Sequence, residues 1–178
     1  MNILENTDIK LRALEPTDID ILYSWENNVD NWEVSNTTAP FSRYILSKYL
    51  ENAHRDIYEN KELRLVIVRK EDDQPIGLID LFDFDPFHGR AGVGILINEQ
   101  KDRNQGYASQ SLECLVNYSF KLLKINLLYC NIAESNKSSI ILFENSKFER
   151  MGVKKNWIRT MDGREDEYYY QLFTQETV

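Results

Sequence analysis

The run RNQGYA at residues 103–108 has the residue types and the spacing of an anion-binding turn. It follows an apolar run, residues 91–98, and leads directly into a helical pattern of apolar residues. Backbone N–H groups in the first turn of a helix have no partner within the helix, so they bind phosphate readily. Gly106 lets the backbone approach such a group closely, and Asn104 is one of the few other residue types that accept a positive φ.

We therefore predict that this turn cradles a pyrophosphate, with Arg103 adding a positive charge. An ordinary strand-to-helix turn has the same pattern and is the alternative. The residues predicted to form the cradle are Arg103, Asn104, Gln105, Gly106, Tyr107, Ala108 and Ser109.

Several other kinds of site are disfavoured by the residues present. The chain has two histidines, His54 and His88, and no HExxH pattern. Cys114 and Cys130 are sixteen residues apart and belong to no CxxC pattern. We therefore expect no metal site, no Ser–His–Asp triad and no disulfide, but two buried, reduced thiols in a cytoplasmic protein. No GxGxxG motif follows the first predicted strand, which disfavours a nicotinamide cofactor.

Length and charge bound the class of protein further. The chain has 178 residues with no repeat or linker, so we expect a single domain over residues 1–178. It carries 21 basic and 29 acidic side chains, a net charge of −8, which disfavours a nucleic-acid partner. An acidic surface attracts a cationic partner, or serves solubility alone. No apolar stretch is long enough to cross a bilayer and no secretory signal is visible, so we expect no membrane partner.

Hydrophobic periodicity predicts an α/β (mixed α+β) fold, with a mixed sheet and helices on both of its faces. The predicted strands are Ile9–Leu14, Leu63–Arg69, Pro75–Phe84, Arg90–Asn98, Asn126–Ala133, Val153–Thr160 and Glu167–Phe173. Helices are predicted from Pro16, with a capping box between Thr17 and Asp20, from Ser42, with an apolar stripe to Ile57, from Tyr107 to Lys121, and from Asn136 to about Ser146. Residues 27–40 are expected to be irregular, and the continuous apolar strand at 126–133 is expected to be buried on both faces.

These motifs, in this order, resemble those of the GNAT superfamily of N-acetyltransferases. The resemblance is carried by LRALE at residues 11–15, by the predicted cradle, and by NKSSIILFENSKF at residues 136–148. It points most to the branch with ribosomal-protein alanine acetyltransferases and bacterial spermidine acetyltransferases. It implies acetyl-CoA as co-substrate, no metal, and a GNAT-like splayed sheet that holds the cofactor between residues 93–98 and 127–133.

The resemblance also implies cofactor contacts beyond the cradle. Backbone groups of Ile95, Leu96 and Ile97 would hold the pantetheine arm and polarise the thioester carbonyl. Asn136 matches a family asparagine that contacts the cofactor, and it is equally suited to cap the helix that it begins.

One departure from the family pattern concerns the proton donor. Phe143 stands where the family commonly has a tyrosine that protonates the departing CoA thiolate, and a phenylalanine has no proton to give. We therefore expect Ser138, Ser139 or water to take that role. Phe143 then packs either against the pantetheine arm or in the core of the helix.

An amine acceptor also needs a base, because an alkylammonium has a pKa of about 10 and only the neutral amine attacks. The candidates are Glu33, between the first two predicted helices, and Asp80 and Asp83 in the run DLFDFD at residues 80–85. These carboxylates are equally suited to bind a cationic substrate or to pass a proton to water. The alternative for DLFDFD is an exposed strand edge or hairpin end.

The function expected from these residues is direct transfer of an acetyl group from acetyl-CoA to a primary amine. The acceptor would be a small cationic molecule or a protein N-terminus. A polyamine acetyltransferase is one alternative, although residues 34–40 lack the acidic cluster that the spermidine enzymes carry there. A non-catalytic acyl-CoA-binding regulatory protein is another, favoured by Phe143. A homo-oligomer remains open.

Overall fold

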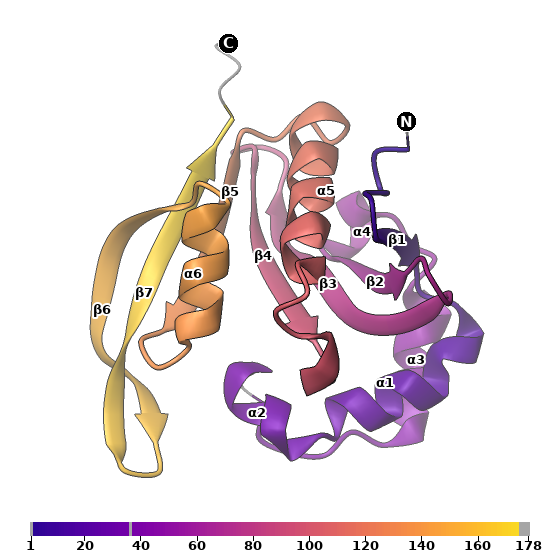
Figure 1. Ribbon diagram of the computed structural model, residues 1–178, viewed down its shortest axis with the longest axis horizontal. Helices are drawn as coiled ribbons and strands as arrows, with labels where there is room; N and C mark the ends of the chain where they lie inside the picture. Colours follow the sequence, from indigo (N-terminus) through magenta and orange to yellow (C-terminus); the bar gives the residue numbers. More distant parts are fainter. Residues whose placement is uncertain (1, 36, 175–178) are drawn as a thin grey trace.

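The computed structural model describes residues 2–35 and 37–174, and for residues 33–35 it describes the backbone alone. Within these residues one sheet has the strand order β1-β2-β3-β4-β5-β7-β6 (Figure 1). Its strands are β1 (Ile9–Ala13), β2 (Leu63–Arg69), β3 (Gln74–Asp85), β4 (Arg90–Ile97), β5 (Leu127–Ala133), β6 (Glu149–Thr160) and β7 (Gly163–Phe173). Neighbouring strands of the described sheet run antiparallel, except for the parallel pair β4–β5. The mixed sheet predicted from the sequence is confirmed.

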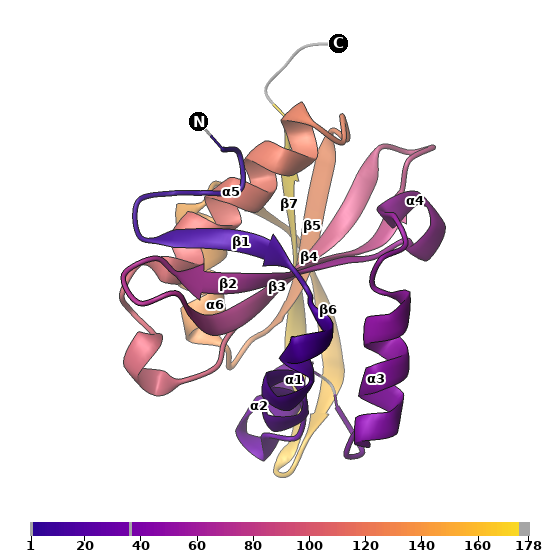
Figure 2. The ribbon, with the colours of Figure 1, turned by 90° about the vertical axis from the view of Figure 1, so that its right-hand side faces the viewer.

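Helices lie on both faces of this sheet, as predicted. The helices are α1 (Ile19–Glu26), α2 (Val29–Ser35), α3 (Arg43–Asn52), α4 (Ile57–Asn60), α5 (Tyr107–Lys121) and α6 (Lys137–Asn145), with short 3₁₀ turns η1 (Pro16–Asp18) and η2 (Gln100–Asp102). Figure 2 shows α5 and α6 on one side of the sheet and α1, α2 and α3 on the other. The apolar alternation of β2 explains this arrangement, since Ile67 is buried in the core beneath α5 and Val66 in the core beneath α1 and α3.

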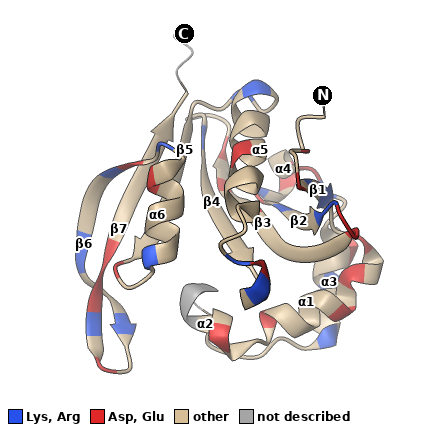
Figure 3. Cartoon of the chain, in the orientation of Figure 1, with Lys and Arg blue, Asp and Glu red and all other residues tan. Residues whose placement is uncertain are grey.

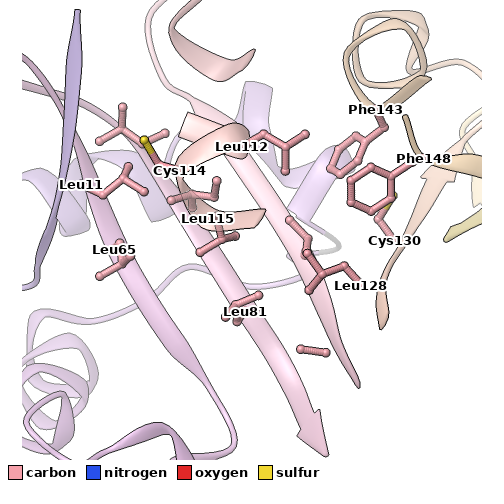
Figure 4. Close-up of a cluster of buried hydrophobic side chains, with 14 of the residues drawn as sticks. Leu11, Leu65, Leu81, Leu112, Cys114, Leu115, Leu128, Cys130, Phe143 and Phe148 are labelled. Atoms are coloured by element: carbon pink, nitrogen blue, oxygen red, sulfur yellow. The ribbon is translucent and has the colours of Figure 1, made fainter. Parts of the chain in front are cut away.

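The core beneath α5 extends to α6 (Figure 4). Leu112 and Leu115 of α5 are fully buried there. Cys130 of β5 lies beside Phe143 and Phe148, whose rings pack edge to face with centroids 4.9 Å apart. Both cysteines are free and buried, as expected. Burial raises the pKa of the Cys114 thiol to about 11, so it is protonated at neutral pH.

The expectation that residues 126–133 are buried on both faces is wrong. Leu128, Cys130 and Ile132 are buried, whereas Tyr129 is half-buried and Asn131 is exposed. The reason is that the core beneath α1 and α3 is built on strands β2 and β3 and does not reach β5. The face of β5 that carries Tyr129 and Asn131 is therefore open.

Two predicted helical regions differ in detail. Residues 27–40 contain the short helix α2, which the polar composition did not indicate. Its entry is held by Asn28, whose side chain accepts from the Asp30 N–H at 3.1 Å, and by the Trp32 indole N–H, which donates to the Glu26 carbonyl at 2.9 Å. Local side-chain hydrogen bonds of this kind supply the partners that a short helix lacks.

The predicted second helix divides into α3 and α4. Ser42 caps α3 as expected, accepting from the Ile45 N–H at 3.2 Å. The helix ends at Asn52, and α4 begins afresh after its own cap, Asp56. The first predicted cap is also displaced, because the capping box is formed by Glu15 and Asp18 rather than by Thr17 and Asp20.

Strands β4 and β5 part after a short stretch of pairing. Their register covers three residue pairs, Arg90–Leu127, Ala91–Leu128 and Gly92–Tyr129. Beyond Gly92, β4 remains paired with β3 as far as Ile97, and beyond Tyr129, β5 remains paired with β7 as far as Ala133. The two halves of the sheet therefore diverge between β4 and β5, which confirms the splayed sheet.

Candidate active site

A cleft of about 390 Å³ lies at the opening between β4 and β5. The start of α5, the exposed face of α6 and the start of α2 complete its walls, and Figure 1 shows these three elements around the opening. The lining residues are Asp30, Asn31, Ile95, Leu96, Ile97, Asp102, Arg103, Asn104, Gly106, Ala108, Ser109, Asn136, Ser138, Ser139, Ile141, Leu142 and Asn145. Most of the residues predicted to contact the cofactor are thus brought together in one cleft.

The turn before α5 has the backbone conformation predicted for it. Asn104 has φ 60° and Gly106 has φ 83°, both in the left-handed region. Gly106 is the N-cap residue of α5, and no described side chain caps that end of the helix. The backbone N–H groups of the first turn, residues 107–109, therefore remain available to an anion at the cleft.

Arg103 braces the turn as well as carrying charge. Its Nε donates to the carbonyl of Ile97 at 3.0 Å, and its Nη2 donates to the carbonyl of Asn98 at 3.0 Å. These bonds fix the guanidinium to the end of β4, beside the cleft. Figure 3 shows basic residues in this segment before α5. The positive charge predicted at the cradle is therefore held in place by the strand that precedes it.

An ion pair anchors the same turn to β2. Asp102 is 5% exposed and is bound by Arg69, which also makes two hydrogen bonds to Asp72 at 2.9 and 2.6 Å. Asp72 raises the pKa of Arg69 above its ordinary value through these bonds, with a further contribution from Asp102. The cationic Arg69 thus links η2 to the end of β2. The sequence did not indicate this link, because the two residues are 33 positions apart.

The start of α6 presents polar groups to the cleft. Asn136 caps the helix, and its Oδ1 accepts from the Ser139 N–H at 3.2 Å and from the Ser138 hydroxyl at 3.1 Å. This confirms the capping role for Asn136. A cofactor contact for its amide group remains a prediction, as does a proton-donating role for Ser139.

The face of α6 toward the cleft was only partly predicted. It includes Ser138, Ile141, Leu142 and Asn145, which follow the spacing of one helix face. Reading that 3.6-residue period from Ser138 would have identified the last three. The family pattern instead directed attention to Phe143, which lies on the other side of the helix.

Three of the predicted cofactor residues do not line the cleft. Phe143 is 3% exposed and packs in the core against Phe148, which favours the core alternative. Gln105 is exposed outside the cleft. Tyr107 lines a separate depression with Arg69 and other residues of the β1 and β2 ends.

The acidic candidates differ in their partners. Asp80 receives two hydrogen bonds from Arg64, at 2.9 and 2.8 Å, and Arg64 also donates to Glu26 at 2.8 Å. Burial opposes the positive charge of Arg64, but the neighbouring Asp80 raises the pKa of Arg64 above its ordinary value. Asp80 is thus already paired with a permanent cation. Glu33 lies in α2, and its side chain is outside the described residues.

Asp83 has no cationic partner among the described residues. It sits where the register of β3 and β4 breaks between Phe82 and Asp85, and its φ is 49°. Its Oδ2 accepts a hydrogen bond from the hydroxyl of Tyr129 at 3.1 Å. Tyr129 was missed from the sequence, because an aromatic residue in an apolar strand has the same pattern as a core residue.

Comparison with known proteins agrees with this geometry. Residues 8–149 match the acetyltransferase (GNAT) domain family. The chain belongs to this family and is therefore an acetyltransferase that takes acetyl-CoA as co-substrate.

Individual relatives are similar over most of their length. An uncharacterized N-acetyltransferase of Bacillus licheniformis, p20, is 25% identical over 99% of this chain and 98% of its own. A spermidine N(1)-acetyltransferase of Vibrio cholerae is 28% identical over 83% of this chain and 82% of its own. The structure of the Vibrio cholerae spermidine N-acetyltransferase in complex with CoA and spermine has a TM-score of 0.83 at 24% identity, covering 94% of this chain and 96% of that one. This structural likeness shows the shared fold.

Two further observations concern the described residues alone. They contain no group of three or more His, Cys, Asp or Glu side chains arranged to hold a metal ion. None of their helices is long and apolar enough to span a membrane.

Proposed function

We propose that this acetyltransferase transfers the acetyl group of acetyl-CoA directly to a primary amine of a small cationic molecule. The observation that carries the proposal is the cleft where β4 and β5 part, which joins an anion-binding turn at one end to unpaired backbone of β4. The chain has a net charge of −8, which favours a cationic acceptor over an anionic one.

Different residues of the cleft would bind different parts of the cofactor. The N–H groups at the start of α5, with Arg103, would hold the pyrophosphate. Ile95, Leu96 and Ile97 would hold the pantetheine arm along the edge of β4 that β5 leaves unpaired. Backbone donors on this edge would stabilise the negative charge that develops on the thioester oxygen.

In the reaction the neutral amine nitrogen attacks the thioester carbon, a C–N bond forms, and the C–S bond breaks. The amine loses one proton and the CoA thiolate gains one. Since Phe143 is buried in the core, we assign the proton donor to Ser138, Ser139 or water at the cleft. Because Asp80 is already paired with Arg64, we assign the role of proton acceptor to Asp83, directly or through water.

A polyamine acceptor is the second candidate. It is favoured by the spermidine acetyltransferase of Vibrio cholerae, which is 28% identical to this chain. The absence of acidic residues from residues 34–40 argues against strict polyamine specificity. The other relative, p20, has no named acceptor.

The test is a screen of acetyl-CoA-dependent thiol release with polyamines, aminoglycosides, amino acids and N-terminal peptides as acceptors. We expect release with one class of cationic small amine, with the acetylated amine identified by mass spectrometry. Acetyl-CoA binding without release to any acceptor would instead support the non-catalytic acyl-CoA-binding protein. Release with N-terminal peptides alone would replace the small amine by a protein N-terminus.

The remaining expectations accompany this proposal. Three of them remain predictions: a single domain over residues 1–178, a cytoplasmic location and a homo-oligomer. The two free cysteines favour the cytoplasmic location.

A further inference from the structure

The carboxylate of Asp83 stands out among the acidic residues of the run at 80–85. Asp80 is bound by Arg64, and Asp85 is bound by His88 at 2.7 Å and by Arg90 at 3.3 Å. Asp83 is exposed and, among the described residues, accepts one side-chain hydrogen bond, from Tyr129. A carboxylate has room for several donors, so Asp83 retains capacity for a ligand.

The position of Asp83 is set by the break in the β3–β4 register. Such an irregularity bends a strand and redirects a side chain. Here Asp83 takes a left-handed conformation, which aspartate tolerates better than most residues, and its side chain meets the hydroxyl of Tyr129 on β5. The contact therefore bridges the two halves of the sheet.

This bridge lies at the apex of the opening. Tyr129 and Gly92 form the last paired position before β4 and β5 diverge. Gly94 lies on the same face two residues further along β4, and a Cβ built there would meet a single described atom within 4 Å, in the Phe82 ring at 3.8 Å. The face above Gly94 is therefore open, one residue before the Ile95–Ile97 segment assigned to the thioester arm.

Aromatic rings pack around Tyr129, the hydrogen-bond partner of this carboxylate. The ring of Phe82 lies over Gly92, where a Cβ would come within 2.3 Å of it. It packs edge to face with Tyr129 at 6.0 Å, and Tyr129 in turn contacts the ring of Tyr169 at 5.9 Å. Strand alternation places all three rings on the face of the sheet opposite α5 and α6, where β5 is open.

We propose that Asp83, with the rings of Phe82, Tyr129 and Tyr169, binds the alkylammonium group of the acceptor and thereby selects aliphatic primary amines. A carboxylate recognises an ammonium by a charge-assisted hydrogen bond, and aromatic faces attract the same cation. The hydroxyl of Tyr129 orients the carboxylate. Burial and the neighbouring Asp83 raise the pKa of Tyr129 to about 12, so that hydroxyl keeps its proton as a donor at neutral pH. The inference rests on the proposed function and names the part of the site that holds its substrate.

The test is calorimetric titration of the CoA-saturated protein with 1,4-diaminobutane, with the uncharged 1,4-butanediol as matched ligand. We expect the diamine to bind and the diol not to bind. Asp83→Asn should weaken diamine binding about tenfold or more, since it removes the charge and keeps the shape. Tyr129→Phe, which keeps the ring and removes the orienting bond, should weaken it by a smaller factor.

The matched control is Asp73→Asn. Asp73 also has a left-handed backbone, with φ 57°, and is exposed, but it lies at the opposite end of β3, in an ion pair with Lys10. This variant changes the net charge equally, so it should bind the diamine as the parent does. Diamine binding by Asp83→Asn within twofold of Asp73→Asn, or equal binding of diol and diamine, would overturn the inference.

Failure of the proposed function gives a different result. Diamine binding that depends on Asp83, without acetyl transfer to the diamine or to any amine of the screen, would support the ammonium site and refute the acetyl transfer. Acetyl transfer to the diamine, with diamine binding unchanged in Asp83→Asn, would support the acetyl transfer and refute the ammonium site.

Discussion

The role of a single residue at this site depends more on its hydrogen-bond and packing partners than on its residue type. Asp80 and Asp83 belong to the same run of sequence, yet one is neutralised by Arg64 and the other is left for a ligand. Asn136 caps the start of α6 with its side-chain Oδ1 and also lines the cleft. Phe143 stands in the place of a family tyrosine and is buried in the core against Phe148.

The first prediction is that Phe143→Tyr destabilises the protein and does not increase turnover. A hydroxyl introduced against Phe148 would be buried without a hydrogen bond, which costs about 1 to 3 kcal/mol of unfolding free energy. Thermal denaturation should show a Tm lowered by at least a few degrees. The same substitution at Phe87, which is 89% exposed, should leave Tm unchanged. A faster enzyme with an unchanged Tm would show instead that the new hydroxyl reaches the cleft.

At the scale of elements, the site depends on the ends of strands and helices. The end of β4, η2 and the start of α5 form one connected segment, tied by Arg103 to the β4 carbonyls and by Asp102 to β2. The left-handed Gly106 aims the first turn of α5 at the cleft. Its conformation, rather than its small size alone, makes this position sensitive, since the one described atom that a Cβ there would meet within 4 Å is Gln110 Nε2, at an ordinary contact distance of 4.0 Å.

We therefore predict that Gly106→Val weakens CoA binding about tenfold or more, because a β-branched residue resists the left-handed conformation and distorts the cradle. Calorimetric titration with CoA measures this change. Gly163→Val is the matched control, since Gly163 also has a positive φ, 146°, but is the first residue of β7, far along the chain from the cradle. Both variants should lose some stability. Equal CoA affinity in the two would show that the cradle lies elsewhere.

A second prediction at this scale concerns the junction of β1 with α1. Asp18 is 5% exposed, and its carboxylate accepts from Arg12 at 2.7 and 2.9 Å and from the Glu15 N–H at 2.8 Å. Burial opposes the charge, but these hydrogen bonds outweigh it and lower the pKa of Asp18 below its ordinary value. A depressed pKa stabilises the folded state above the unfolded-state value of about 4, and the contribution is lost as pH falls below it.

Asp18→Asn should accordingly lower the unfolding free energy at pH 7 by about 1 to 2 kcal/mol and reduce the loss of stability on acidification. Urea denaturation at a series of pH values from neutral to acidic measures both effects. Asp20→Asn is the control, since its ion pair with Arg43 is exposed and contributes little. Parallel stability curves for Asp18→Asn and the parent would contradict the assignment.

At the scale of the whole molecule, the divergence of two half-sheets creates the cleft. In one half, β2 and β3 contribute to the cores on both faces, whereas in the other half the face of β5 and β7 away from α6 carries the half-buried Tyr129 and Tyr169. The cofactor and the amine can therefore meet at the opening from opposite faces of the sheet. The net charge of −8 adds an attraction for the cationic partner alone.

We predict that the KM for a cationic acceptor rises with salt concentration while kcat changes little. Charge attraction over the surface is screened within about 8 Å at physiological ionic strength, so raising salt from about 50 to about 300 mM weakens it. Initial rates at saturating acetyl-CoA, with sodium chloride and potassium acetate compared, separate screening from specific ion effects. A KM that does not respond to either salt would show that steering by net charge plays no part.

Residue types and local periodicity are sufficient to predict the parts of the site whose geometry is local. The strand before residue 98, the left-handed Asn104 and Gly106, the helix from Tyr107 to Lys121 and the cap at Asn136 follow from residue type and periodicity over a few positions. The family pattern added the splay between β4 and β5, which the register confirms.

Contacts between residues far apart in the chain could not be predicted in this way. Arg64 pairs with Asp80 from the neighbouring strand and with Glu26 from α1, and Tyr129 reaches Asp83 over 46 positions. Phe143 faces the core rather than the cleft because α6 turns its Ser138 and Leu142 side toward the opening. Such contacts depend on how strands are ordered and helices are rotated, and those are set by the packing of the whole core, which no local spacing encodes.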